Sequence, residues 1–215
     1  MPGPHRPLWL LSILTAFTAV LTLSAQGNLD ARVQRFLDDN RSRWREMNVP
    51  TVDGQTLHDI IVKHKYTRAL EIGTSTGHSG IWIAWALSKT GGKLITIDID
   101  EGRHREALKN FEAAGVSQYI DARLGDAHTI VPALQGPFDF VFSDADKEWS
   151  KNYLIAVLPK MAVGGCYATH NVSGGRWRRM RGGDDYYQFL LAQPNLETTV
   201  DNRGAGMAIS FKRRP

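Results

Sequence analysis

The sequence predicts an α/β protein built on a doubly wound, mostly parallel sheet of seven strands. Two observations lead to this fold class. Short, continuously apolar runs alternate along the chain with stretches of helical period, and this pattern is typical of a parallel sheet with helices on both faces. The last two strand-like runs are joined by the short segment 201–204, whose Asn and Gly favour an antiparallel hairpin at the carboxyl end.

Each expected element rests on the spacing of its apolar residues. Leu29 and Val33, and later Leu57 and Ile61, lie four positions apart, so two helices are expected before the first strand. From there strands and helices alternate. The expected helices cover Leu29–Met47, Thr56–Lys63, His78–Leu87, Arg103–Ala114, Thr129–Leu134, Trp149–Leu158 and Asp185–Gln193. The expected strands cover Arg68–Ile72, Lys93–Ile99, Tyr119–Leu124, Phe138–Ser143, Gly165–His170, Glu197–Val200 and Gly206–Lys212.

Composition narrows the class of protein. The 215 residues can bury one hydrophobic core, so one folded domain is expected. The formal net charge is +4 and the basic residues are dispersed outside residues 176–181, which argues against nucleic acid as a partner. Cys166 is the single cysteine, so an intramolecular disulfide and a cysteine metal cluster are excluded, and its apolar surroundings predict a small core residue.

An apolar segment near the amino terminus predicts a targeting sequence. Residues 8–23 are uncharged and largely apolar, with Arg6 before them and Ser24-Ala25-Gln26-Gly27 after them. Residues 1–27 are interpreted either as a signal peptide cleaved after Gly27 or as an uncleaved anchor, with membrane association through residues 8–25. Arginines between residues 32 and 45 would keep a domain of residues 28–215 on the cytoplasmic side of an anchor. The expected location is membrane-anchored or exported, and the side of the membrane stays open.

The segment from Glu71 to Gly80 has the pattern of a turn that binds a nucleotide cofactor. An apolar strand runs into an acid, then into Gly73 and Gly77, then into an amphipathic helix whose first N–H groups can face an anionic group. The spacing is G-x-x-x-G rather than the G-x-G-x-x-G typical of dinucleotide sites. An acid two residues before the first glycine suits a cofactor with a positive or hydrogen-bond-donating end, such as S-adenosylmethionine.

Polar residues follow five expected strands at the point where each strand ends. Ligands of open α/β sheets bind outside these carboxyl ends, so the residues there are candidates for a site. Purely structural alternatives stay open, because Asp98 and Asp126 could cap helices and Asp144 could stabilise a turn. The candidates are Glu71, Asp98, Gly125-Asp126-Ala127, Asp144 and His170-Asn171.

Several motifs together resemble the class I S-adenosylmethionine-dependent methyltransferases, and among these the catechol and caffeoyl-CoA O-methyltransferases. The resemblance covers nearly all of the chain after the amino-terminal segment. Its motifs are Met47-Asn48-Val49, Gly54-Gln55, the Glu71–Gly80 turn, Leu94-Ile95-Thr96-Ile97-Asp98-Ile99-Asp100, Phe140-Val141-Phe142-Ser143-Asp144-Ala145-Asp146-Lys147, His170-Asn171-Val172 and Gly204-Ala205-Gly206. The resemblance implies a Rossmann-like methyltransferase fold and the transfer of a methyl group from S-adenosylmethionine to a hydroxyl of a small, phenolic or catechol-like acceptor.

The resemblance also implies roles for individual residues at the two ends of the site. Asp98 would accept hydrogen bonds from the ribose hydroxyls, with Ile99 on the adenine and Ala127 lining its pocket. Lys147 would be the general base that takes the proton of the acceptor hydroxyl, and a nearby divalent ion would help by stabilising the phenolate. Asp144 would lie between cofactor and metal. The methionine end of the cofactor would be held by Val49, Glu71, Gly73 and Ser79.

One residue departs from the family pattern. The family's magnesium site uses two aspartates and an asparagine, whereas this chain offers Asp144, His170 and Asn171. Replacing a carboxylate by an imidazole disfavours Mg²⁺ and is tolerated by Mn²⁺ or Zn²⁺. Three interpretations stay open: a transition-metal site, a metal-independent site with His170 as base or substrate partner, and a structural histidine.

Other features leave alternatives open. The loop 174–183 carries four arginines and Trp177, which favours an anionic acceptor, an anionic lipid surface or a solvated loop. An NAD-dependent oxidoreductase is the alternative enzyme, and a non-catalytic cofactor-binding domain is the alternative without turnover. The oligomeric state is undetermined, with a homodimer as one candidate.

Overall fold

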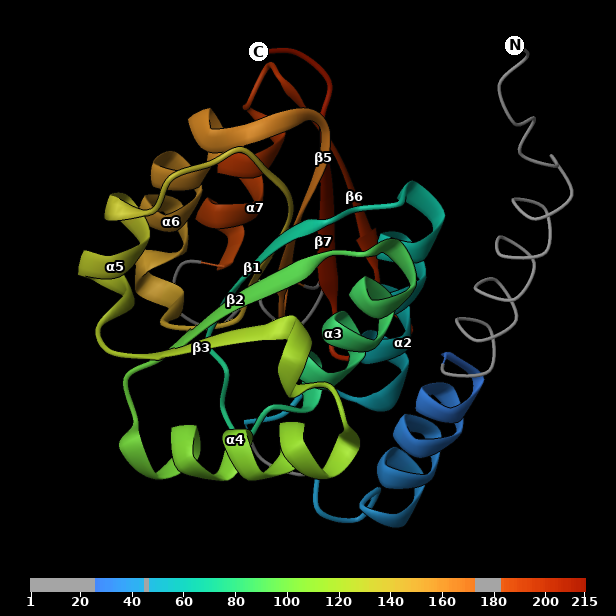
Figure 1. Ribbon diagram of the computed structural model, residues 1–215. Helices are drawn as coiled ribbons and strands as arrows, with labels where there is room; N and C mark the ends of the chain where they lie inside the picture. The colour runs from blue at the N-terminus through green and yellow to red at the C-terminus, as the bar shows by residue number, and fades with distance from the viewer. Residues whose placement is uncertain (1–25, 45–46, 173–182) are drawn as a thin grey trace, which may run out of the picture.

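The computed structural model describes residues 26–44, 47–172 and 183–215 and confirms the predicted fold class. The sheet has the strand order β3-β2-β1-β4-β5-β7-β6, with β1 to β5 parallel and β7 antiparallel to both of its neighbours (Figure 1). From β1 the chain adds β2 and β3 on one side, and it then returns to place β4 on the other side of β1. The carboxyl ends of β1 and β4 therefore lie side by side. The strands are β1 (Arg68–Ile72), β2 (Lys93–Asp98), β3 (Ile120–Leu124), β4 (Phe138–Ser143), β5 (Met161–His170), β6 (Leu196–Asp201) and β7 (Met207–Lys212).

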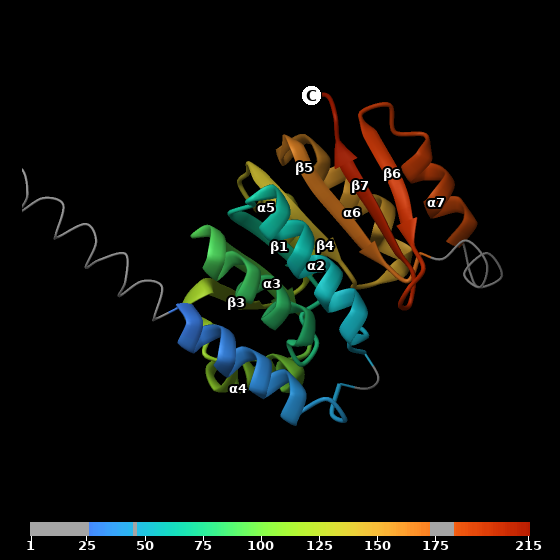
Figure 2. The same ribbon diagram turned by 90° about the vertical axis from the view of Figure 1, so that its right-hand side faces the viewer.

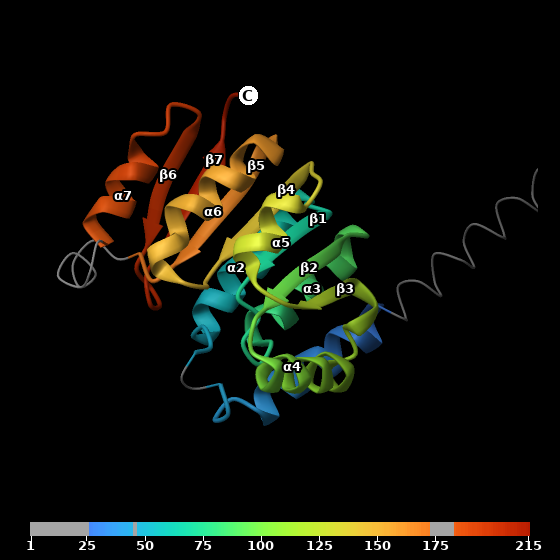
Figure 3. The ribbon, with the colours of Figure 1, turned by 90° about the vertical axis from the view of Figure 1, so that its left-hand side faces the viewer.

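Helices cover both faces of this sheet. In Figure 2, α2 and α3 lie on the face turned to the viewer, and Figure 3 shows α5, α6 and α7 on the opposite face. A helix over residues 26–39 packs on the outside of α3 and α4. The labelled helices are α2 (Thr51–His64), α3 (His78–Thr90), α4 (Glu101–Ala114), α5 (Ala127–Ala133), α6 (Ser150–Val157) and α7 (Gly183–Leu191). Short 3₁₀ turns cover Ser117–Tyr119, Lys147–Trp149 and Leu158–Lys160.

Alternating side chains of the central strands fill a separate core on each face. From β1, Leu70 and Ile72 are fully buried against the α5, α6 and α7 side, whereas Ala69 faces the α2 and α3 side. A third cluster joins Val33 of the first helix to Phe111 of α4. Burial of each such side chain contributes on the order of 1.5–3 kcal/mol, which fixes the strand ends rigidly relative to one another.

Helix and strand boundaries differ from the predictions where the apolar pattern weakens. The first helix gives way to a turn at Asn40 instead of continuing to Met47. α2 begins at Thr51, directly after Pro50, five residues before the predicted start. β5 begins at Met161 because Gly164, with φ of 87°, interrupts the apolar run without ending the strand. Cys166 is buried in that strand, as predicted.

The predicted targeting segment, residues 8–25, lies outside the described residues. Among the helices of residues 26–44, 47–172 and 183–215, none has the length and apolar character needed to cross a membrane.

Candidate functional site

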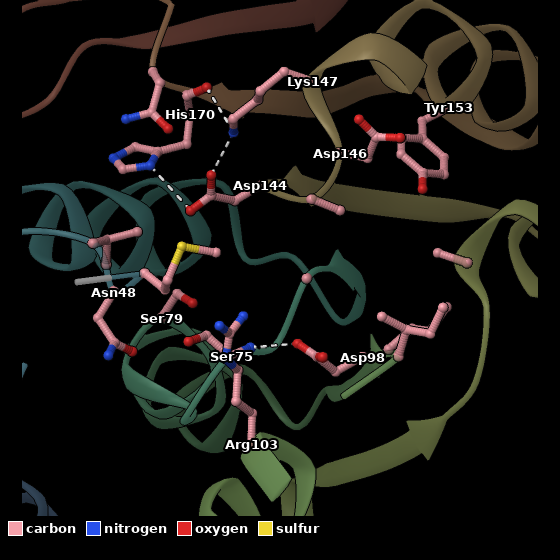
Figure 4. Close-up of a pocket in the computed structure, with 18 of the residues that line it drawn as sticks. Asn48, Ser75, Ser79, Asp98, Arg103, Asp144, Asp146, Lys147, Tyr153 and His170 are labelled. Atoms are coloured by element: carbon pink, nitrogen blue, oxygen red, sulfur yellow. Dashed lines mark hydrogen bonds and ion pairs between the residues drawn. The ribbon is translucent and has the colours of Figure 1, made fainter. Parts of the chain in front are cut away.

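A cavity of about 660 Å³ opens at the carboxyl ends of β1 to β5, where the sequence places its candidate residues. Figure 4 shows polar side chains converging on it from several strand ends. Ten of the predicted site residues line it: Val49, Gly73, Ser79, Asp98, Ile99, Ala127, Asp144, Lys147, His170 and Asn171. The lining also contains residues that were not singled out as site residues, among them Met47, Asn48, Ser75, Arg103, Asp146 and Tyr153.

The turn between β1 and α3 forms one wall of the cavity. Gly73 has φ of 97°, and a Cβ there would lie 2.8 Å from the carbonyl oxygen of Asp144. Gly77, with φ of 96°, stands at the N-cap of α3, and a Cβ there would lie 2.7 Å from the ring of Phe111. Both glycines therefore allow a backbone approach that other residues would block. The backbone N–H of Gly73 donates to the carbonyl of Ile97 at 2.9 Å, which ties β1 to β2 below the cavity.

Glu71 is the exception among the predicted site residues, because it lies beneath the cavity and not on its surface. Its side chain is fully buried, and Oε2 accepts a hydrogen bond from the hydroxyl of Thr96 at 2.6 Å. Burial raises the pKa of Glu71 to about 8, although hydrogen bonds from Ser79 and Thr96 oppose the shift. Burial therefore favours the protonated form of this acid, which lies beneath the turn.

Asp98 is held in place at the end of β2 by the neighbouring backbone. The N–H of Ser75 donates to Oδ2 at 2.7 Å (Figure 4), and the N–H of Asp100 donates to Oδ1 at 2.8 Å. A carboxylate has about four acceptor positions, so both oxygens can still accept from a ligand. The helix-cap alternative for Asp98 is wrong, because Asp100 caps α4 by accepting from Arg103 at 2.9 Å.

Two side chains flank Asp98 on the adjoining wall. Ile99 is 71% exposed, an unusual position for a large apolar side chain, and forms an open apolar surface next to the carboxylate. Ala127 begins α5, and Asp126 caps that helix by accepting from the N–H of His128 at 2.9 Å, so the cap alternative is right for Asp126.

A chain of charged groups lines the other end of the cavity. Lys147 Nζ lies 2.6 Å from Asp144 Oδ1, and Nδ1 of His170 lies 3.0 Å from Asp144 Oδ2, a charge contact rather than a well-aligned hydrogen bond (Figure 4). Lys147 Nζ also donates to the backbone carbonyl of His170 at 3.4 Å. Asp144 therefore interacts with two neighbours at once, so its side chain is more than a turn residue.

Asp53 of α2 completes this chain, and sequence reasoning missed it. Nε2 of His170 lies 2.9 Å from Oδ2 of Asp53, which also accepts the backbone N–H of Ala205 at 2.9 Å. Gly204 makes this approach feasible, because a Cβ there would lie 1.9 Å from Asp53 Oδ1. A sequence signal does exist: Asp53 falls four and eight positions before Leu57 and Ile61, on the apolar side of its helix.

Burial and neighbouring charges shift the pKa values of His170 and Asp144 in opposite directions. Burial would lower the pKa of His170, but its contacts with Asp144 and Asp53 outweigh that effect and raise the pKa to about 9. Burial would raise the pKa of Asp144, but the charge of Lys147 and the contact with His170 hold that pKa below its usual range. Across the described part of the chain, no group of three or more His, Cys, Asp and Glu side chains is arranged to hold a metal ion.

The arginine-rich loop lies outside the described residues, apart from Gly183 at the start of α7. The interpretations made for its arginines and Trp177 therefore stay predictions.

Comparison with known proteins identifies the family. The sequence matches the O-methyltransferase family over residues 28–180, so the chain belongs to this family. It is similar to a catechol O-methyltransferase from Niastella koreensis, with 45% identity over 82 residues that cover 36% of this chain and 37% of the relative. It is 34% identical to caffeoyl-CoA O-methyltransferase 1 from Eucalyptus globulus over 133 residues, covering 60% of this chain and 54% of the relative. The matched regions thus span about half or less of these curated relatives.

Solved structures share the fold over nearly their whole length. An O-methyltransferase from Bacillus cereus, determined in complex with SAH, is 25% identical with a TM-score of 0.72, covering 85% of this chain and 91% of that one. The O-methyltransferase TomG from Streptomyces achromogenes, determined in complex with SAM, is 26% identical with a TM-score of 0.71, and the match covers 85% of this chain and 90% of that one. These comparisons give no support to an oxidoreductase.

The family assignment corrects the predicted location of the protein. The prediction of a membrane-anchored or exported protein rests on residues 8–25, outside the matched region 28–180. That prediction is wrong, because the matched region is an α/β fold whose helices bury their apolar sides against the sheet and one another.

Proposed function

We propose that this protein is an O-methyltransferase that moves a methyl group from S-adenosylmethionine to a hydroxyl of a small phenolic or catechol-like acceptor. The observation that carries the proposal is that one cavity of about 660 Å³ contains the carboxylate of Asp98 in one part and Lys147 with Asp144 in another. This volume lies within the range of ligand sites that bury a drug-sized molecule. Membership of the O-methyltransferase family supports the same reaction, and residues 28–215 would form the catalytic domain.

The cofactor would bind along the wall made by the β1 turn and the end of β2. Both oxygens of Asp98 keep an acceptor position for the two ribose hydroxyls, since each accepts one backbone N–H. Ile99 and Ala127 would flank the adenine. Gly73 and Ser79 would contact the methionine end with Val49, and Glu71 would act indirectly by supporting the turn that carries them.

The acceptor would bind where Lys147 faces the cavity. Its oxygen attacks the methyl carbon in line with the sulfur, the carbon–sulfur bond breaks, and the sulfide product leaves with the bonding electrons. A neutral amine can keep donating one hydrogen to Asp144 while its lone pair takes the acceptor's proton, so the contact of 2.6 Å is compatible with Lys147 as the base. Holding the two reactants in line lowers the activation free energy by up to about 7–11 kcal/mol.

Two measurements test the proposal. Calorimetric titration with S-adenosylhomocysteine should show one-site binding, and titration with NAD should show none; the reverse pattern would refute a methyltransferase. The full chain is then incubated with labelled S-adenosylmethionine and a panel of phenols and catechols, and label in the acceptor is counted. If no member of the panel is labelled, the phenolic acceptor class is wrong.

The role of Lys147 is tested with a matched pair of variants. Lys147→Ala should lower the rate by about 10²- to 10⁴-fold with S-adenosylhomocysteine affinity retained, as expected for loss of a general base. Lys151→Ala removes a lysine from α6 whose ion pair to Asp185 spans 3.8 Å outside the cavity, and it should leave the rate unchanged. Equal rates for both variants would remove Lys147 from the mechanism. The predicted homodimer and an anionic acceptor stay predictions of the sequence.

A further inference from the structure

The imidazole of His78 joins the first turn of α3 to the segment that precedes α2. That segment contains Met47, Asn48 and Val49, which all line the cavity, and Figure 4 shows Asn48 there. Ser79, the next residue of α3, lines the cavity as well, whereas His78 is only 1% exposed and lies behind this wall. The imidazole can therefore act on a ligand only through the residues that it holds.

The partners of the two ring nitrogens fix where the ring carries its hydrogen. Nδ1 of His78 lies 2.9 Å from the carbonyl oxygen of Val49, and a carbonyl only accepts hydrogen bonds, so Nδ1 carries a hydrogen and donates it. The indole N–H of Trp82 donates to Nε2 at 3.1 Å, and an indole N–H only donates, so Nε2 carries no hydrogen. The ring is therefore neutral, and burial lowers the pKa of His78 to about 4, which agrees with a neutral ring at neutral pH.

Aromatic packing holds the imidazole in position. The ring of Trp44 stacks on that of His78, with the ring centroids 4.6 Å apart and the planes inclined by 6°. Gly54, in the first turn of α2, lets the helix approach Trp82 closely, because a Cβ at Gly54 would overlap the indole ring. Stacked and buried rings of this kind have few alternative positions. The packing of α3 therefore sets the place at which the ring meets the carbonyl of Val49.

A second link joins the same segment to the glycine turn. Nδ2 of Asn48 donates to the hydroxyl of Thr76 at 3.0 Å, and that hydroxyl donates to Oδ1 of Asn48 at 3.1 Å. The carbonyl of Thr76 in turn accepts from Asn110 of α4 at 2.8 Å. Met47 has φ of 66°, a left-handed conformation that costs free energy in a residue with a side chain. The two links offset this cost and hold the segment 47–49 against the turn.

We propose that His78 is a positioning residue for the methyl donor, because its hydrogen bond to Val49 keeps the segment 47–49 in place at the cofactor part of the cavity. This inference rests on the proposed methyltransferase function. A segment that is already in its bound conformation spares the cofactor the free energy of ordering it. The apparent affinity is proportional to the fraction of molecules in which the segment is in place. Loss of the contact between His78 and Val49 therefore weakens cofactor binding, although His78 does not line the cavity.

A matched pair of variants isolates the contact with Val49. His78→Leu and His78→Asn both lose the acceptor for Trp82, but the amide nitrogen of asparagine is bonded to Cγ, as Nδ1 is, and can still donate to Val49. In calorimetric titrations of the full chain, His78→Leu should bind S-adenosylhomocysteine about 10- to 100-fold more weakly than the wild type, since a buried carbonyl is left unpaired. His78→Asn should restore most of this affinity. Equal affinities for the two variants would overturn the proposal.

A control variant separates loss of affinity from loss of stability. Val157 is fully buried on α6, in the core on the opposite face of the sheet. Val157→Ala should lower the free energy of unfolding in urea, because it leaves a cavity in that core, and should keep the wild-type affinity for S-adenosylhomocysteine. If Val157→Ala weakens binding as much as His78→Leu does, the affinity follows overall stability and the positioning role is wrong.

Two further measurements do not depend on the folding of His78→Leu. In ¹⁵N-labelled wild-type protein at neutral pH, Nδ1 of His78, assigned by loss of its signal in His78→Asn, should carry a hydrogen and Nε2 should not; a hydrogen on Nε2 would overturn the proposal. Thr76→Val removes the hydroxyl that holds Asn48 and keeps its shape. It should weaken S-adenosylhomocysteine binding by about 3- to 10-fold, and unchanged affinity would show that the position of the segment does not affect the cofactor.

The titration of the wild type distinguishes the two levels of the argument. If S-adenosylhomocysteine does not bind the wild type, the proposed function fails. If it binds the wild type and His78→Leu equally well, only the positioning role of His78 fails.

Discussion

The buried acid below the glycine turn should make the stability of the protein fall as pH rises. Glu71 is fully buried, and burial raises its pKa from 4.5 to about 8. Between these values the unfolded chain releases the proton while the folded chain keeps it, so the free energy of unfolding falls with increasing pH. The shift, at about 1.36 kcal/mol per pKa unit, corresponds to an upper limit of about 5 kcal/mol lost between pH 4.5 and pH 8.

The variant Glu71→Gln removes the titrating group while keeping its shape. We expect the variant to gain stability relative to the wild type as pH rises from 4.5 to 8, by about 3–5 kcal/mol in all, and the difference to level off above pH 8. Urea unfolding of both proteins at half-unit pH steps measures this difference directly, because other titrating groups cancel. Glu106→Gln, at an exposed position on α4, serves as control and should show no such trend. A difference between wild type and Glu71→Gln that does not change with pH would refute the reasoning.

Three further predictions concern the cofactor wall. Asp98→Asn should weaken S-adenosylhomocysteine binding by about 10- to 100-fold in calorimetry, since hydrogen bonds to a charged acceptor contribute about 1.5–3 kcal/mol; unchanged affinity would remove Asp98 from the cofactor site. Gly73→Ala should lower the free energy of unfolding by more than Gly91→Ala does. Both glycines have positive φ, but only a Cβ at Gly73 would lie 2.8 Å from a backbone oxygen. Equal losses of stability in urea unfolding would contradict this. Ile99→Ala should weaken S-adenosylhomocysteine binding with little change in stability, because the side chain is 71% exposed, and a large loss of stability would show a packing role.

The sequence was sufficient for the strand ends because their signals are local. Each strand of the parallel part is a short apolar run, and the polar residue that ends it stands next in the chain, as Asp98 follows Ile97. Since parallel strands align their carboxyl ends, ten predicted residues come to line one cavity. Glu71 shows the limit of this reasoning, because the side of a strand on which a residue lies depends on the faces of the folded sheet, and this acid points into the core.

Asp53 could not be placed from the sequence for a different reason. It stands 117 positions before His170, on a helix whose approach to the β6–β7 hairpin depends on packing across the whole sheet. The contact needs Gly204 as well, since a Cβ there would collide with the Asp53 carboxylate. An acid on the apolar side of α2 indicated burial, but burial alone does not name a partner. Only the folded chain shows that the partner is the histidine that departs from the family pattern.

Different segments of the chain build the two parts of the cavity, so the residues of one part can change without changing those of the other. The cofactor part comes from three consecutive strand-to-helix connections, which contain Gly73, Asp98 and Asp126-Ala127, and hydrogen bonds with nearby backbone hold Gly73, Asp98 and Asp126 in place. The acceptor part joins α2, β4, β5 and the terminal hairpin, so a substitution at His170 changes the contacts with Asp53 and Asp144 and leaves Asp98 untouched. A chain can therefore carry a histidine where the family pattern has an aspartate and keep the residues that would bind its methyl donor. The acceptor therefore has to be identified by methylation assays, because the cofactor wall would be the same whichever acceptor binds.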